Sequence, residues 1–177
     1  MKEEEIVEYV EACIEKVALE YGNFPDSFDS EGDLRAYLYH LIAKNTFFTD
    51  LFDYEGEDET FKTKYLHAEY PTFSKIKQFT GHFDLTMLNP DQSNQENDNL
   101  ICIELKRRRF SSLKSIEAIR KDIQKLSNKQ NDIKYKYLLL FRTNILFNQE
   151  DKDEISALKR NSDIKIYLVD TKGYDVI

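Results

Sequence analysis

The chain has 177 residues, of which 41% are apolar and 13% aromatic, a composition that is typical of a globular domain and excludes an intrinsically disordered chain. No apolar run is long enough to span a membrane, and the acidic start lacks the basic and then apolar pattern of a signal peptide, so we expect one cytoplasmic domain over residues 1–177 with no membrane partner. The formal net charge of −8 counts against a nucleic-acid partner unless the positive charges gather in one place.

Two amphipathic helices are predicted in the first 45 residues. Over residues 4–19, apolar residues at positions 6, 10, 13 and 17 recur with helical spacing. Over residues 31–45, apolar residues recur at i, i+3, i+4, i+7 and i+8, and Ser30 with Asp33 has the spacing of a capping box. The next residues, 49–60, show no clear period and are expected to form an acidic connector.

A mixed sheet is predicted from the remaining pattern. Strands are expected over residues 63–70, ended by Pro71, and over residues 80–89 and 100–106. The segment PDQSNQENDN between the last two has no apolar residue, so it should be a hairpin loop. A helical pattern over residues 112–127 precedes a strand over 135–143, which indicates a parallel crossover. A helix in QEDKDEISALKR and a strand in DIKIYLVD complete the order α-α-β-β-β-α-β-α-β.

The strand over residues 100–106 carries charged residues where a core strand carries apolar ones. Alternation places Leu100, Cys102, Glu104 and Lys106 on one face. Asp84 interrupts the preceding strand, and hairpin pairing can bring it beside Glu104. Removing such charges from water is costly, and two carboxylates repel each other unless a hard cation lies between them. These three side chains are therefore candidates for a functional site rather than for the core.

Positive charge gathers directly after this strand. Residues 104–129 hold nine bases and three acids, a net charge of +6, whereas residues 1–60 hold four bases and 17 acids, a net charge of −13. A local positive field can attract a polyanion although the whole chain is acidic, and the alternative is an ordinary solvated helix face. The candidate residues for nucleic-acid binding are Arg107, Arg108, Arg109, Lys114, Arg120, Lys121 and Lys125.

Asp84, followed twenty residues later by the IELK of positions 103–106, resembles the signature of the PD-(D/E)XK nuclease superfamily. The resemblance covers roughly residues 30–143 and implies the restriction-endonuclease-like fold, an α/β fold with an αβββαβ core and a mixed central sheet. The N-terminal helix and the C-terminal helix and strand would be additions to that core. His82 and Phe83 stand where the superfamily's name expects a proline before the acid, which is a departure from the pattern.

The resemblance implies a nuclease that depends on Mg²⁺ or Mn²⁺ and hydrolyses phosphodiester bonds, in DNA rather than RNA. Asp84, Glu104 and the backbone carbonyl of Leu105 would bind the metal, and Lys106 would orient or help deprotonate the attacking water. Members often add one further acid. The candidates are Glu31, which could instead simply suit a helix N-terminus, and Glu69, which could instead be an exposed residue at a strand end.

Two other functions remain consistent with the sequence. One is a catalytically inactive nucleic-acid-binding or scaffold domain on the same fold, and the other is an acidic interaction protein that binds a basic partner. Because one domain that cuts both strands of a duplex usually dimerises, a homodimer is also expected if the protein is a nuclease.

Overall fold

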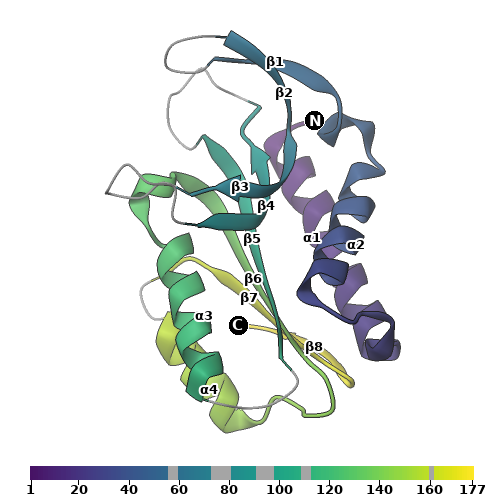
Figure 1. Cartoon of the computed structure of the whole chain (residues 1–177), viewed down its shortest axis with the longest axis vertical. Coiled ribbons are helices and arrows are strands. Elements are labelled where there is room, and N and C mark those ends of the chain that lie inside the picture. The colour runs from purple at the N-terminus through teal and green to yellow at the C-terminus, as the bar shows by residue number, and fades with distance from the viewer. Residues whose placement is uncertain (56–59, 73–80, 91–97, 109–112, 160–161) are drawn as a thin grey trace.

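Four α-helices and two β-sheets make up the part of the chain that the computed structural model describes, which is residues 1–55, 60–72, 81–90, 98–108, 113–159 and 162–177 (Figure 1). The helices are α1 (Glu3–Asn23), α2 (Glu31–Ala43), α3 (Leu113–Leu126) and α4 (Gln149–Lys159), with short 3-10 helices η1 (Pro25–Ser27), η2 (Thr46–Phe48) and η3 (Lys129–Asn131). The smaller sheet pairs β1 (Leu51–Glu55) with β2 (Thr60–Lys64). The larger sheet has the order β3 (Leu66–Pro71), β4 (His82–Leu88), β5 (Asn99–Arg108), β6 (Ile133–Arg142), β7 (Lys165–Asp170) and β8 (Gly173–Val176).

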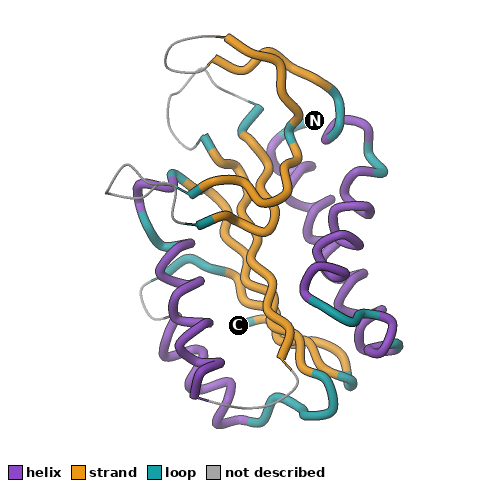
Figure 2. Tube along the Cα trace, viewed as in Figure 1, coloured by secondary structure: helices purple, strands orange, loops and turns teal. Residues whose placement is uncertain are grey.

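The larger sheet is mixed, as the sequence predicted. Strands β3, β4 and β5 are antiparallel neighbours, β5, β6 and β7 are parallel, and β8 returns antiparallel to β7. The predicted hairpin pairing of β4 with β5 and the predicted crossover from β5 through α3 to β6 are therefore confirmed. Helices α1 and α2 lie on one side of the sheet and α3 and α4 on the other, which gives three layers (Figure 2).

Two apolar clusters fill the space between these layers. Ile101, Ile103 and Leu105 face the cluster under α1 and α2, whereas Cys102 faces the cluster under α3 and α4. The predicted alternation along β5 is therefore confirmed at these positions. Leu100 departs from it and packs with the first cluster, close to the point where the register of β4 and β5 shifts.

No helix within the described ranges is both long and apolar enough to cross a membrane. The apolar faces of the four helices contribute instead to the two clusters against the sheet.

The prediction of an acidic connector over residues 49–60 was wrong, because β1 and the start of β2 lie there. Side chains hold β1 against β2 and against Tyr65, the residue that follows β2. Phe52 stacks on Tyr65 with ring centroids 3.9 Å apart, and Lys62 forms a cross-strand ion pair with Asp53 at 2.9 Å. In β1 the aromatic residues Phe52 and Tyr54 do alternate with Asp53 and Glu55, but this period covers only four residues within an otherwise acidic segment, so it was not recognised in the sequence.

The strand boundaries differ from the prediction by up to three residues, and the largest difference is at the start of β3. The strand expected over residues 63–70 is β3, which begins at Leu66 and includes Pro71. Because β3 is an edge strand, the missing N–H of Pro71 removes no hydrogen bond that the sheet requires. Strand β8 was not predicted; it has only four residues and begins directly after a turn with Gly173, whose φ of 131° favours glycine.

The N-terminus of α2, which carries Glu31 and Arg35 toward the sheet, is fixed by the predicted capping box. The Ser30 hydroxyl accepts a hydrogen bond from the Asp33 N–H at 3.1 Å, and Asp33 accepts one from the Ser30 N–H at 2.9 Å. Both bonds satisfy backbone donors that the helix itself leaves unpaired.

We expect Ser30→Ala to lower the free energy of unfolding by about 1 kcal/mol, because the cap is lost while the rest of the helix is unchanged. Urea denaturation followed by circular dichroism measures the loss. Ser27→Ala is the matched control, since Ser27 is an exposed serine in η1 with a backbone hydrogen bond alone. Equal stability of the two variants would show that the capping box contributes nothing.

Candidate active site

Strands β4 and β5 part at Asp84. Their register ends at Leu85 opposite Ile103, whereas β5 continues to Arg108 along β6. The carboxylate of Asp84 accepts a hydrogen bond from the N–H of Leu105 at 2.8 Å, so a side chain takes the place of the strand partner that the separation removes. Asp84 is thereby fixed next to the end of β5 that carries the charged residues.

Glu104 is a buried carboxylate with only 1% of its surface exposed. Its pKa is raised to about 8, chiefly by burial and also by the charge of Asp84, while Lys125 opposes both effects. The Lys125 ammonium lies 2.6 Å from Glu104 Oε1 and also donates to the His82 carbonyl at 2.9 Å. Helix α3 therefore supplies the counter-charge of this acid.

Lys106 lies between the helices on the two sides of the sheet. Its ammonium is 3.3 Å from Glu31 Oε2 at the start of α2 and 3.5 Å from Asp122 Oδ2 on α3. Burial disfavours its charge, but the surrounding carboxylates outweigh burial and raise the pKa of Lys106. The side chain is therefore held as an ammonium group by acids from two separate elements.

Of the two candidate further acids, Glu31 contacts Lys106 directly, whereas Glu69 is linked to the cluster through Arg35. The Arg35 guanidinium lies 3.2 Å from Asp84 Oδ1 and 2.7 Å from Glu69 Oε1. Glu69 has a φ of 53°, which is unfavourable for a glutamate and marks a locally strained point in the edge strand. Arg35 thus joins α2 to both β3 and β4.

The predicted basic surface divides into several environments. Lys125 points inward to Glu104, and Arg107 donates to a backbone carbonyl before α2 at 2.9 Å. Arg120 pairs with Glu117 at 2.9 Å, and Lys121 is exposed on α3. Arg109 and the side chains of Arg108 and Lys114 lie outside the described residues.

Sequence reasoning did not include Arg35 and Asp122 in the site. Asp122 adjoins Ile123 and follows Ile119 by three residues, so an acid on the apolar stripe of α3 was a usable signal. Arg35 follows Glu31 by four residues, which places both on one side of α2. What the sequence could not supply was the partner that each charge meets across the sheet.

The site offers carboxylate oxygens, the ligand type that hard divalent cations prefer, but most of its negative charge is balanced. Four carboxylates, Glu31, Asp84, Glu104 and Asp122, face the three cations Arg35, Lys106 and Lys125. The net charge is −1 when every group is ionised and 0 when Glu104 is protonated, which its raised pKa favours near pH 7. Glu104 Oε1 and Asp122 Oδ2 are shielded from water and rely on ion pairs alone. Within the described part of the chain, however, no three acidic, histidine or cysteine side chains converge as a preformed metal cage.

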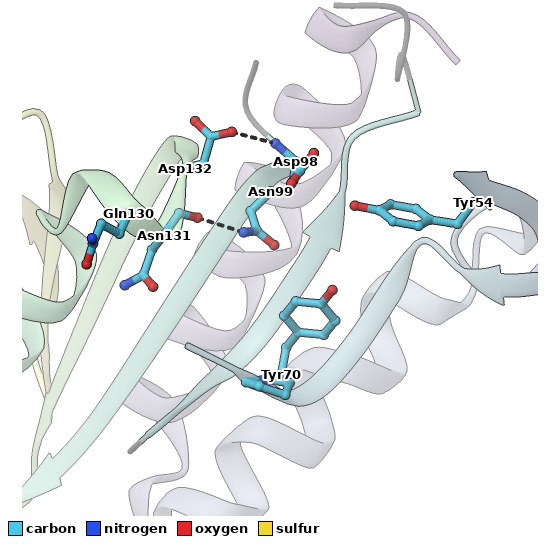
Figure 3. Close-up of a pocket in the computed structure, with 8 residues that line it drawn as sticks. Tyr54, Tyr70, Asp98, Asn99, Gln130, Asn131 and Asp132 are labelled. Atoms are coloured by element: carbon cyan, nitrogen blue, oxygen red, sulfur yellow. Dashed lines mark hydrogen bonds between the residues drawn. The ribbon is translucent and has the colours of Figure 1, made fainter. Parts of the chain in front are cut away.

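A cavity lies at the opposite end of β5 (Figure 3). It has a volume of about 340 Å³ and is lined by Tyr54 and Tyr70 on one side and by Asp98, Asn99 and Asp132 on the other. The two acids repel phosphate groups. The end of β5 at Glu104 and Lys106 is therefore the better candidate for phosphodiester chemistry.

No family model matches the chain, and no curated protein or solved structure is significantly similar to it. The function of the site rests on its geometry.

Proposed function

We propose that the protein is a metal-dependent nuclease with a restriction-endonuclease-like core, and that it hydrolyses phosphodiester bonds in DNA. The observation that carries the proposal is the meeting of Asp84, Glu104, Lys106 and Glu31 where β4 and β5 part. Apart from β1 and β2, which are inserted after α2, the order α2-β3-β4-β5-α3-β6 supports the αβββαβ core. Buried charges from three separate elements are costly to the fold, which favours a functional role over coincidence.

Each side chain of the site has a separate role in the proposed hydrolysis. Asp84 and Glu104, with the Leu105 carbonyl, would hold the cation, which when bound supplies a Lewis acid for the phosphate and the water. The Lys106 ammonium offsets phosphate charge and orients the water by donating a hydrogen bond. Glu31 and Asp122 fix the position of that ammonium from two sides. These roles require Arg35 and Lys125 to leave their present carboxylate partners.

We expect wild-type protein to cleave DNA in Mg²⁺ or Mn²⁺ and Lys106→Ala to lose at least about a hundredfold in rate, because the half-buried ammonium at the reacting phosphate is gone. Titrations of both metals with single-stranded, duplex and branched DNA, and with RNA, measure this. Lys16→Ala on α1 is the matched control, since Lys16 is exposed. Absence of cleavage with every metal and substrate would refute the proposal.

A catalytically inactive nucleic-acid-binding domain on the same fold is the second candidate. The observation that favours it is that Arg35 and Lys125 already neutralise Asp84 and Glu104. Such a domain would bind DNA equally well in the presence of a chelator and of a divalent metal, and it would not cleave DNA. The same metal titration therefore separates the two functions.

A further inference from the structure

A groove between α2 and β3 opens next to the candidate active site. Its volume is about 510 Å³, and its walls carry Arg35 and Tyr39 from α2 and Lys64 and His67 from the β2–β3 segment. The small residues Gly32 and Ala36 keep the α2 side of the groove open. This groove lies on the side of the site away from α3, where the sequence had placed the basic surface.

The positive charge of the groove that no described acid balances comes from Lys64, because Arg35 is paired with Asp84 and Glu69. Among the described residues that line it there is no acid, whereas Arg35 and Lys64 are both cations. Lys64 is exposed and forms no ion pair with any described residue, so its charge is available to a ligand. Burial lowers the pKa of His67, and its ring meets the Lys64 carbonyl at 2.7 Å, so His67 shapes the wall as a neutral ring.

Arg35 makes the groove continuous with the site. It lines the groove and at the same time lies 3.2 Å from Asp84, one of the two proposed metal ligands. A chain of phosphates that passes the reacting position can therefore continue past Arg35, which offsets the charges of Asp84 and Glu69, into the groove. The volume is that of a pocket for a small molecule, so it suits one nucleotide unit and not a duplex.

We propose that this groove holds one single-stranded nucleotide segment next to the phosphate that is cleaved, with Lys64 on a phosphate and Tyr39 as the aromatic wall for a base. The inference rests on the proposed nuclease function and adds to it the form of the substrate. Positive charge that follows a backbone, together with an aromatic surface, is how proteins bind single strands without reading their sequence.

Fluorescence anisotropy of labelled oligonucleotides in EDTA tests the groove without any cleavage. We expect Lys64→Ala to weaken binding of a single strand about fivefold and to reduce the salt slope by about 0.7, as for one lost phosphate contact. Tyr39→Leu should weaken single-strand binding without changing the salt slope, because it removes stacking and no charge. Lys62→Ala is the matched control on the same strand, since Lys62 pairs with Asp53 and does not line the groove.

The outcomes separate this inference from the proposed function. If the wild-type protein cleaved DNA and Lys64→Ala bound a single strand as tightly as wild type, the proposed role of the groove would be refuted and the nuclease function would stand. If Lys64→Ala bound a single strand more weakly while the wild-type protein cleaved no substrate, the groove would be supported and the nuclease function refuted. Equal losses for a blunt duplex and a single strand would overturn the assignment of a single strand.

Discussion

Glu104→Gln and Asp84→Asn are expected to abolish metal-dependent cleavage, with rates at least about a thousandfold below wild type, while DNA binding stays equal or becomes slightly tighter. Each change removes a carboxylate, which hard divalent cations prefer over an amide, and with it the negative charge that the carboxylate carries near the phosphate when it is ionised. The amides keep the size of the side chains, and the amide oxygen introduced by Asp84→Asn can still accept the hydrogen bond from the Leu105 N–H. Nicking assays in Mn²⁺ and filter binding in EDTA measure the two effects separately.

The exposed acid Glu117 on α3 provides the control, because Glu117→Gln removes one negative charge at a distance from the buried carboxylates. That variant should retain full cleavage. Full activity in Glu104→Gln would refute the catalytic role of this residue. A parallel loss of DNA binding in both site variants would indicate a damaged fold instead of lost chemistry.

The part of the site that the sequence predicted depends on local rules. Alternation along one strand places Glu104 and Lys106 on the same face, and a hairpin brings Asp84 to the neighbouring strand. Both rules act over a few residues, and the apolar pattern sets the register. The strong capping signal at Ser30 likewise located the start of α2 and with it Glu31.

The part of the site that the sequence did not predict depends on which charged side chains of the helices contact those of the sheet. Lys125 belongs to a run of basic residues and was interpreted as part of an outer surface, yet it points inward to Glu104. The phase of α3 decides this, because Ile119, Ile123 and Leu126 fix which side faces the sheet. Helix phase is visible in the sequence, but the partner on β5 depends on how far α3 slides along the strand, and no local pattern gives that distance.

The buried carboxyl group of Glu104 should make the free energy of unfolding depend on pH when divalent cations are removed. Burial raises the pKa of Glu104 to about 8 in the folded protein, against an ordinary value of 4.5. The folded state therefore binds the proton of Glu104 more tightly than the unfolded state does, and this proton binding stabilises the fold. The stabilisation is fully present below about pH 4.5 and is lost as the pH rises through 8. We expect wild-type protein in EDTA to lose on the order of 3 kcal/mol of unfolding free energy between pH 5 and pH 8 because of this group.

Urea denaturation of wild type and Glu104→Gln across this pH range measures the effect as a difference, which cancels the titration of all other groups. The glutamine cannot ionise, so the difference should grow in favour of the variant as the pH rises. Glu117→Gln should follow the wild-type curve, since Glu117 is exposed. If the curves of wild type and Glu104→Gln ran parallel, Glu104 would have no raised pKa. An inactive variant that is more stable than wild type at pH 8 would mean that this carboxylate is kept for its chemistry and against the stability of the fold.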